Sequence, residues 1–501
     1  MNTRQLHVGI VGAGLSGLRC ADILIQNGAR VTILEARDRI GGRVHQEDVG
    51  RHLVDLGPNW IHGTGNNPIM SIAEATKTTT HDPEGENILL SRDGAVVDAD
   101  LATKASEFMW TTIEQAFEYS NKHGESIPAG RSLFNFFQEK VQQTGFSPAE
   151  QELCLDACKL WGAYVGDPIE RQSLKFFCLE ECTDGSNYFV ASTYKRILEH
   201  VSRTAREQAD IRLNQPVSRI DTVPRKDGEQ HQVTLTTTTG DRYAFDEVVV
   251  TCPLGWLKRN QHAFHPQLPN RLRQAIDGIS YGRLEKVYVT FPRAFWQSGP
   301  NGKGVGPDWA QFLEPNYTDH PAHIQWSQEC LSLASLPPSC AQPTLLFYVY
   351  GPCATHLVEG IADLEPSSAD YKDFLVQFLQ PFFSRLPGYS VSSPDCKPSA
   401  CLATRWQADP YAGNGSYCNF QVGLTQADKD IEALRSGGGL GCSQGLWFAG
   451  EHTAPFVALG TTTGAYWSGE RAGRQLCQAR GLGSVGIGAG RDDSLPSAHK
   501  Q

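Results

Sequence analysis

The sequence predicts an α/β protein of two closely packed domains, one of them discontinuous. At 501 residues the chain is too long for one hydrophobic core, which favours two domains. A strand, a glycine-rich turn and a helix begin at Leu6, and a second strand at 29–35 completes a βαβ unit. A strand, a turn and a helix return at 445–477. Because similar patterns lie at both ends, the second domain is expected to be inserted in pieces.

Periodic patterns organise the chain between these two ends. Helical periodicity dominates residues 68–200, and strand alternation returns at 211–220, 232–238 and 243–253. Residues 41–63 form a glycine-rich connection with few periodic signals. No internal repeat is apparent, so the middle of the chain is expected to mix helices and sheet.

The first turn has the features of a phosphate cradle. Residues 8–17 place a G-x-G-x-x-G motif directly after a strand and at the start of a helix. Gly12 permits the tight turn, Gly14 lets the backbone approach a pyrophosphate, and Gly17 lets helix and strand pack closely. The helix N-terminus adds unpaired N–H groups and a partial positive charge. A Rossmann-like, dinucleotide-binding unit is expected here.

The residues after the second strand extend this site. Glu35 stands where a carboxylate can accept both hydroxyls of a ribose, which favours NAD or FAD over NADP. Residues 35–43 then read E-A-R-D-R-I-G-G-R. Such a loop can bring backbone and guanidinium groups against a second stretch of phosphate and sugar.

This run resembles the signature of the FAD-dependent amine oxidases. Three further segments fit that family in order. The D-L-G-P-N-W-I-H-G segment at 55–63 resembles the stretch beside the flavin ring in polyamine oxidases. T-C-P-L-G at 251–255 resembles a strand-to-loop stretch near the cofactor, and W-F-A-G-E-H-T at 447–453 resembles the closing FAD motif. The motifs cover most of the chain apart from its tail.

The resemblance implies an amine-oxidase type of fold, with a discontinuous Rossmann-like FAD-binding domain and an inserted α+β substrate-binding domain. The expected boundaries are 1–80, 201–290 and 398–480 for the FAD-binding domain, and 81–200 and 291–397 for the substrate-binding domain. The remaining tail, 481–501, is rich in Gly, Ser and Asp and is expected to be disordered.

The same resemblance assigns the cofactor site. Glu451 is expected to bind the ribityl chain, and the backbone near Thr463 to face the pyrimidine edge of the flavin. Ser416 occupies the position where monoamine oxidases carry the cysteine bonded to the flavin, so FAD is expected to be non-covalent. The residues expected to bind FAD are Gly12, Gly14, Leu15, Ser16, Gly17, Glu35, Ala36, Arg37, Gly42, Arg43, Gly57, Pro58, Asn59, Trp60, Val217, Trp406, Gly450, Glu451 and Thr463.

The strand predicted at 281–291 contains a candidate catalytic residue. Its alternation places Val287 and Val289 on one face and Tyr288 on the other. If both faces are covered, Glu285 or Lys286 enters an apolar environment, where an unpaired charge is costly. If one face is open to solvent, neither is buried. The resemblance favours the first case, because Lys286 matches the lysine that holds a water against flavin N5.

Residues 406–417 resemble the loop that supplies aromatic residues to the substrate cage. Tyr417 is expected to form one wall, whose π-face suits an amine, although a tyrosine elsewhere is usually a core residue. Two positions depart from the family. The segment after the G-E-H-T motif is one residue longer, which leaves the role of Phe456 open, and Pro58 replaces a small residue. Both concern the choice of substrate rather than FAD binding.

His62 is the candidate for amine recognition because it belongs to the flavin-adjacent segment. It is equally consistent with a structural histidine. Glu180, Glu181 and Asp184 form an acidic cluster that can attract a distal ammonium, but a solvated helix end is the expected explanation. The catalytic candidates are therefore Lys286, His62 and Tyr417.

Composition limits the partners. Lys plus Arg total 44 against 55 Asp plus Glu, a formal charge of −11, which disfavours nucleic acid and suits cationic small molecules. No secretory signal or membrane-spanning run is visible. The 14 cysteines lack metal-type spacing, so no metal site is expected and a cytoplasmic location is the default.

The resemblance implies oxidation of a polyamine or related amine at the carbon beside nitrogen, with O2 reduced to H2O2. Three alternatives stay open. A histone-lysine-demethylase-like activity shares the motifs, although its relatives carry helical modules and basic patches not expected here. An L-amino-acid oxidase requires an arginine facing the substrate carboxylate. A non-catalytic flavin-binding interaction protein would bind FAD that no amine reduces.

Overall fold

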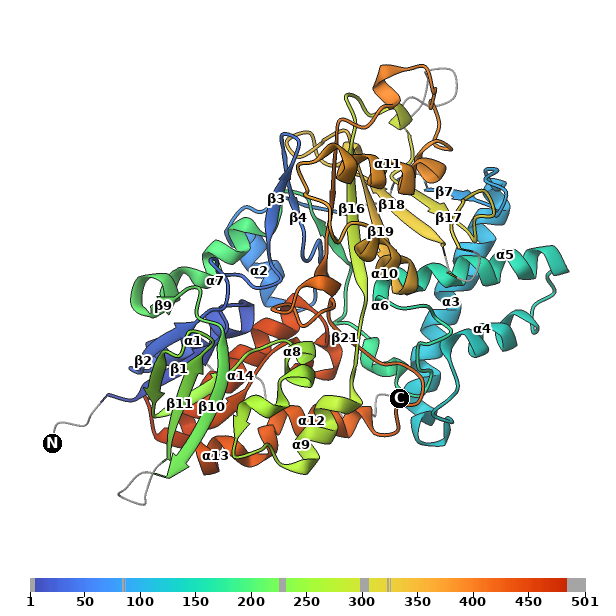
Figure 1. Cartoon of the computed structure of the whole chain (residues 1–501). Helices are drawn as coiled ribbons and strands as arrows, with labels where there is room; N and C mark the ends of the chain where they lie inside the picture. Colours follow the sequence, from blue (N-terminus) through green and yellow to red (C-terminus); the bar gives the residue numbers. More distant parts are fainter. Residues whose placement is uncertain are drawn as a thin grey trace.

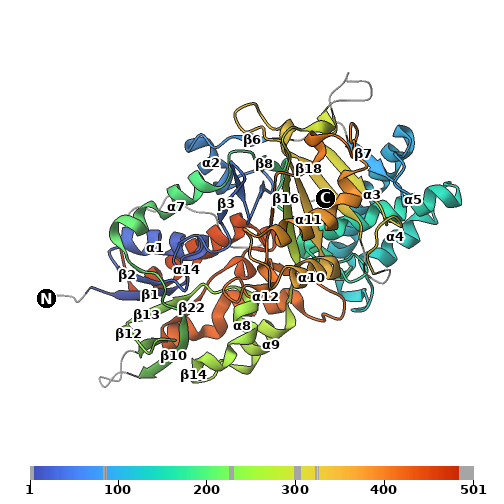
Figure 2. The same ribbon diagram turned by 45° about the horizontal axis from the view of Figure 1, so that its top comes forward.

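The computed structural model describes residues 5–82, 85, 87–224, 231–297, 306–321, 324 and 326–483. Figures 1 and 2 show a sheet that contains the first strands of the chain at one end of the molecule. Helices α3, α4 and α5 lie at the other end, and a second large sheet lies between them. The fold mixes helices with parallel and antiparallel sheets, so it is α/β, as the sequence predicts.

The first sheet is parallel and draws on three distant parts of the chain. Its order is β22-β13-β1-β2-β9. Near-continuous apolar runs such as V-G-I-V in β1 predict strands buried on both faces, and residues 8–11 of β1 and all four residues of β13 are buried. The strands are β1 (His7–Val11), β2 (Arg30–Leu34), β9 (Asp210–Arg212), β13 (Glu247–Val250) and β22 (Leu446–Phe448).

Helices α1 and α14, with α2 and α7 beside them, share one apolar core with a face of this sheet. Helix α14 packs on α1 so closely that a Cβ on Gly469 would lie 2.1 Å from the Ser16 carbonyl oxygen. A four-stranded sheet packs against the other face of the first sheet, where Val11 and Val248 share a core with Phe245. Its strands are β12 (Arg242–Phe245), β11 (His231–Thr237), β10 (Val217–Pro224) and β14 (Phe264–His265).

The second large sheet has six strands in the order β20-β16-β19-β18-β17-β7. All its pairings are antiparallel except that of β17 with β7. One face packs against α10 and α11 through residues such as Val287 and Phe347, and the other carries Tyr288 and Tyr348. The strands are β7 (Asn87–Leu90), β16 (Leu284–Thr290), β17 (Trp309–Phe312), β18 (Gln328–Ser332), β19 (Thr344–Tyr350) and β20 (Ala400–Ala403).

Local sequence accounts for several helix ends. Ser147 and Glu150 form a capping box at the start of α5, with Pro148 in its first turn. The helices are α1 (Leu15–Gln26), α2 (Pro68–Ala75), α3 (Ala99–His123), α4 (Leu133–Val141), α5 (Pro148–Cys158), α6 (Gly162–Val165), α7 (Lys195–Gln208), α8 (Leu254–Arg259), α9 (Asn270–Gly278), α10 (Gly351–Gly360), α11 (Ala369–Phe383), α12 (Ala427–Ser436), α13 (Leu440–Gln444) and α14 (Thr462–Arg480).

Three expectations about strands were wrong. The strand pattern expected at 211–220 is divided between β9 and β10, which belong to different sheets. The strand expected at 243–253 is two strands, β12 and β13, in different sheets. Asp246 separates them, because its N–H donates to the His7 carbonyl (2.9 Å) and its carboxylate accepts from the His7 N–H (2.8 Å). The connection at 41–63 also contains a hairpin of β3 (Gln46–Val49) and β4 (His52–Asp55), whose exposed polar residues gave no apolar alternation.

Three short pairings complete the described sheets. They are β15 (Ser280–Tyr281) with β21 (Cys418–Asn419), the β3–β4 hairpin, and β5 (Trp60–Ile61) with β8 (Tyr188–Val190) and β6 (Thr80–His81).

The division into domains stays a prediction. Strands β16 and β20 belong to the six-stranded sheet, although the expected boundaries assign their residues to the FAD-binding domain. Residues 484–501 of the expected disordered tail lie outside the described residues.

Candidate active site

One cavity of about 1270 Å³ connects the two large sheets. It exceeds the roughly 300–1,000 Å³ of ordinary small-molecule pockets, so it has room for a large cofactor and a second molecule. The predicted site residues that line it are Gly12, Gly14, Leu15, Ser16, Glu35, Ala36, Arg37, Gly42, Arg43, Gly57, Pro58, Asn59, Trp60, His62, Val217, Lys286, Trp406, Tyr417, Gly450 and Glu451.

Two predicted residues, Gly17 and Thr463, do not line the cavity. Gly17 packs behind it, where an added Cβ would lie 2.1 Å from the Gly12 carbonyl oxygen. The Thr463 hydroxyl is buried and donates to Asn67 Oδ1 (2.9 Å) in the first turn of α14. The neighbouring Thr461 and Thr462 line the cavity instead.

The turn between β1 and α1 has the geometry of an anion cradle. Gly12 has φ +104°, a conformation that side chains with a Cβ rarely adopt. A Cβ on Gly14 would meet no atom within 4 Å, so space remains beside the backbone for a ligand. No side chain caps α1 at Gly14, which leaves its first N–H groups available to phosphate oxygens.

Glu35 closes this cradle from the end of β2. Its Oε2 accepts a hydrogen bond from the Ala13 N–H (2.7 Å), and its Oε1 accepts one from the Arg37 N–H (2.9 Å). The side chain is buried, so its position is determined by these two backbone groups. Each carboxylate oxygen keeps a further lone pair for a ligand hydroxyl.

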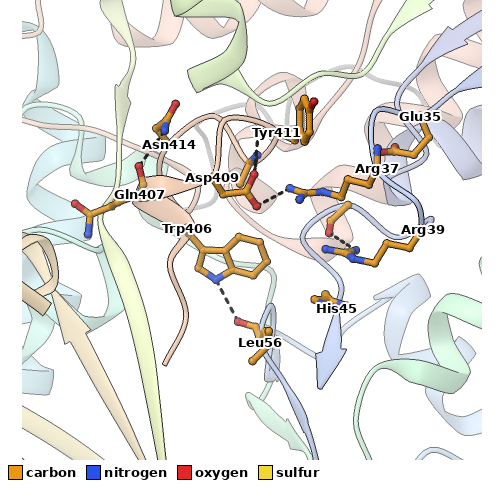
Figure 3. A network of polar contacts seen from close by, with 12 residues as sticks. Glu35, Arg37, Arg39, His45, Leu56, Trp406, Gln407, Asp409, Tyr411 and Asn414 are labelled. Carbon is orange, nitrogen blue, oxygen red and sulfur yellow. Dashed lines mark hydrogen bonds and ion pairs between the residues drawn. The ribbon is translucent and has the colours of Figure 1, made fainter. Parts of the chain in front are cut away.

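The loop after Glu35 is tied to the loop at 406–414 (Figure 3). Arg37 donates to Asp409 (2.7 Å), and its guanidinium carbon lies 5.5 Å from the ring centroid of Tyr411. Trp406 Nε1 donates to the Leu56 carbonyl (3.3 Å). The two loops therefore form one wall of the cavity, although 372 residues separate Arg37 from Asp409.

The half-buried Arg43 and the buried Glu451 form an ion pair in the cavity wall. Arg43 Nη1 donates to Glu451 Oε1 (3.1 Å), to the Ser416 carbonyl (2.6 Å) and to the Tyr281 hydroxyl (3.1 Å). Burial alone would raise the pKa of Glu451, but the charge of Arg43 holds it below its usual range. Glu451 Oε2 is buried and has no hydrogen-bond partner among the described residues.

These features fit the FAD that the resemblance implies. The open space at Gly14 and the uncapped start of α1 suit a pyrophosphate, and Glu35 suits an adenosine ribose. The unpartnered Glu451 Oε2 is an acceptor for a hydroxyl such as those of a ribityl chain. FAD bound here would supply the redox chemistry, and the protein would orient it.

Lys286 projects from β16 into the cavity. It is 6 % exposed, and its Nζ donates to the Gly57 carbonyl. Burial lowers the pKa of Lys286, although the charge of Asp55 opposes this effect, and burial raises the pKa of Asp55. A buried lysine with a lowered pKa is typical of functional sites.

His62 and Tyr417 also contribute to the cavity wall. Burial lowers the pKa of His62, and a hydrogen bond with Asn187 opposes that effect. The Tyr417 hydroxyl donates to the Tyr164 carbonyl (2.6 Å), which holds its ring against the cavity. The burial of His62 therefore favours the neutral form of its imidazole at neutral pH.

The open question about Phe456 is answered by its position. Phe456 does not line the cavity; it packs against the apolar core behind the first sheet. Leu459, Gly460 and Thr461 line the cavity at this point. A Cβ on Gly460 would lie 3.2 Å from the Tyr417 ring, so a glycine stands beside the cage aromatic. Pro58 lines the cavity next to Asn59.

The structure adds residues to the cavity beyond those predicted to form the site. Glu180, which was expected at a solvated helix end, lines the cavity, and its Oε1 accepts from Gln172 Nε2 and from the Phe420 N–H (both 3.1 Å). Glu329, Tyr348 and Trp309 line the wall beside Lys286. No motif marks Glu329, Tyr348 or Trp309, because only the strand order β16-β19-β18-β17 brings them into one sheet with Lys286.

Two further findings concern metals and membranes. Among the described residues, no group of three or more His, Cys, Asp or Glu side chains has the arrangement of a metal site. No helix in the described part of the chain is long and apolar enough to cross a membrane.

Comparison with known proteins identifies the family. The family model for flavin containing amine oxidoreductases matches residues 15–477. The chain is 28 % identical over 439 residues to probable polyamine oxidase 4 of Arabidopsis thaliana, covering 85 % of this chain and 79 % of that protein. It is 25 % identical over 493 residues to polyamine oxidase 4 of Oryza sativa subsp. japonica, covering 95 % and 90 %.

Histone demethylases show a comparable sequence identity but are longer proteins, of which the match covers about half. The chain is 27 % identical over 483 residues to lysine-specific histone demethylase 2 of Homo sapiens, which covers 93 % of this chain but 53 % of that protein. The match of the family model over nearly the whole chain is decisive. This protein, an FAD-dependent amine oxidoreductase, belongs to the family of flavin containing amine oxidoreductases.

Proposed function

We propose that the protein oxidises a polyamine or a related amine at the carbon beside nitrogen, with O2 reduced to H2O2. FAD, bound non-covalently, supplies the chemistry by accepting a hydride equivalent from that carbon. The observation that carries this proposal is Lys286, a buried lysine that faces the same cavity as the phosphate cradle. Its lowered pKa suits a group that holds a water or assists O2 rather than one that attacks substrate.

The chain would prepare the amine for this reaction. An aliphatic amine with a pKa near 10 must lose its proton before the carbon is oxidised, and a dry cavity favours that loss. His62, favoured in its neutral form by burial, can accept a hydrogen bond from the amine. Tyr417 would hold the substrate through its ring face. These roles, with those of the FAD-binding residues, belong to the proposal.

The binding mode and location of the protein are also proposals. Ser416 presents a hydroxyl rather than a thiol where monoamine oxidases bond the flavin, which supports non-covalent binding. A cytoplasmic location and the absence of a nucleic-acid partner rest on composition alone.

Amino-acid oxidation is less well supported than amine oxidation. It requires an arginine that faces the substrate carboxylate. The arginines of the described chain that line the cavity are Arg37, Arg43 and Arg259, and each is engaged elsewhere. Arg37 pairs with Asp409, Arg43 with Glu451, and Arg259 donates to the Gly255 and Gly413 carbonyls.

The test is the visible spectrum of the purified protein mixed anaerobically with candidate substrates. These are spermine, spermidine, their N-acetyl forms, monoamines, amino acids and methylated histone peptides. Bleaching of the flavin band by polyamines is the expected result. Bleaching by methylated peptides alone would indicate a demethylase, and bound flavin that nothing bleaches would indicate a non-catalytic role.

A further inference from the structure

Strand register places a carboxylate in line with Lys286 across the six-stranded sheet. Lys286 pairs with Tyr348, Tyr348 with Glu329, and Glu329 with Gln311. Directly paired residues of antiparallel strands project from the same face. With strands about 4.8 Å apart, the Cα atoms of Lys286 and Glu329 lie roughly 10 Å from each other along this row. Both side chains face the cavity.

Glu329 is buried with little to compensate its charge. It is 4 % exposed, and its Oε2 accepts a hydrogen bond from Gln311 Nε2 (2.8 Å). Its Oε1 accepts no hydrogen bond, and neither oxygen forms an ion pair, within the described part of the chain. A buried carboxylate without a cation is costly, so a cationic ligand at this point would be stabilised.

The surface between Lys286 and Glu329 is aromatic. The Trp60 and Trp309 rings stack with centroids 5.9 Å apart, and Trp309 stacks on Tyr348 at 6.4 Å. Trp60 Nε1 donates to the Tyr348 hydroxyl (3.0 Å), which holds the two rings together. Such a surface suits a chain of methylenes that carries ammonium groups.

We propose that Glu329 binds an ammonium group of the substrate that is distal to the amine being oxidised, and so selects amines with two or more nitrogens. This inference deepens the proposed function. Three or four methylenes between two nitrogens span about 5–6 Å, with bonds of about 1.5 Å. The distance of roughly 10 Å along the row therefore corresponds to about two such spacers.

Glu180 is a half-buried carboxylate that also lines the cavity, and it is the competing candidate. Its Oε1 already accepts two hydrogen bonds, one of them from the Phe420 backbone, so it anchors the segment after β21. It also lies close to Glu451 and Tyr417, on the FAD side of the cavity. The charge of Glu451 raises the pKa of Glu180, and the charge of Glu180 raises the pKa of Tyr417. The Glu329 carboxylate, by contrast, accepts no hydrogen bond from a backbone N–H among the described residues.

The experiment measures binding and turnover separately. The FAD-loaded protein and its Glu329→Gln, Glu329→Asp and Glu180→Gln variants are titrated calorimetrically with spermidine and with butylamine. Anaerobic flavin reduction is then followed with the same amines. Glu207→Gln, on the exposed surface of α7, removes the same charge away from the cavity and is the matched control.

In Glu329→Gln the affinity for spermidine is expected to fall roughly 10- to 100-fold, as for a lost charge-assisted hydrogen bond, with butylamine unchanged. Glu329→Asp should retain part of the preference. Because the result is a ratio of two ligands on one variant, a general loss of folding does not imitate it. An unchanged ratio in Glu329→Gln, or a loss confined to Glu180→Gln, would overturn the proposal.

The binding arm also separates this inference from the proposed function. If spermidine binds through Glu329 but reduces no flavin in the unmodified protein, polyamine oxidation is wrong and the binding site stands. If polyamines reduce the flavin and Glu329→Gln keeps the same preference, the oxidation stands and the site is wrong.

Discussion

Glu285 and Lys286 are neighbours in the chain, yet each is buried on a different face of β16. Glu285 is 0 % and Lys286 6 % exposed. Glu285 accepts from the Thr404 hydroxyl and from the N–H groups of Trp406 and Gln407, whereas Lys286 faces the cavity. The sequence predicted one buried charge at this strand. Both are buried because both faces of the sheet are covered.

Replacing Lys286 by Met tests its role at the residue scale. We expect reoxidation of the reduced flavin by O2 to slow by about 10²–10³-fold, as for loss of a group that assists proton transfer, with a smaller effect on anaerobic reduction. Stopped-flow measurement of the two half-reactions provides the comparison. Lys258→Met is the control, because Lys258 lies outside the cavity and donates to the Asp277 carbonyl. Unchanged reoxidation would contradict the role.

His452 predicts a pH dependence of stability. Its ring nitrogens have no partner among the described residues, and burial lowers its pKa to about 4 from 6.5. Between pH 6.5 and pH 4 the histidine is protonated in the unfolded chain but stays neutral in the folded protein. The free energy of unfolding is therefore highest above pH 6.5 and falls as the pH is lowered towards 4. The loss is about 3 kcal/mol. Urea unfolding should show a weaker pH dependence in His452→Gln; equal slopes would refute the assignment.

At the scale of elements, two loops and one strand determine the cavity wall. The loop after β2 is held to the loop at 406–414 by the Arg37–Asp409 pair (Figure 3). Strand β16 holds the same second loop through Glu285, which accepts from the Trp406 N–H (3.0 Å). Two hydrogen bonds position Trp406. Its backbone N–H donates to Glu285, and its indole N–H donates to the Leu56 carbonyl. Neither contact is visible in local sequence.

Glu285→Gln should therefore weaken this junction. The amide replaces one acceptor oxygen with a donor that faces backbone N–H groups, so we expect the free energy of unfolding to fall by about 2–3 kcal/mol. Denaturant unfolding measures the change, with Glu207→Gln as the exposed control. A difference below about 0.5 kcal/mol, the usual size of a surface effect, would show that Glu285 does not hold the loop.

At the scale of the whole molecule, the cavity connects segments from the two ends and the middle of the chain. The cradle comes from β1 and α1, Glu451 from the C-terminal part, and Lys286 from the six-stranded sheet. A ligand that fills this cavity contacts all of them. Its binding should therefore stabilise the molecule as a unit.

FAD is accordingly expected to raise the thermal unfolding midpoint. At free FAD 100 times its Kd the gain is about 2.7 kcal/mol, if only the folded protein binds it. Calorimetry of flavin-free protein, with and without added FAD, provides the measurement.

Acid precipitation of the loaded protein should release the flavin into the supernatant. Flavin that stays in the pellet would contradict non-covalent binding.

The sequence by itself determined the phosphate cradle, Glu35, the closing motif and the alternation of β16, because short-range spacing encodes turns, strand faces and helix starts. It also identified the family through those motifs. Only the tertiary structure decided that Glu285 and Lys286 are both buried, that Phe456 packs into the core, and that Glu180 and Glu329 face the cavity. These outcomes depend on which elements cover a face and which strands pair, and such contacts join residues that are far apart in the chain.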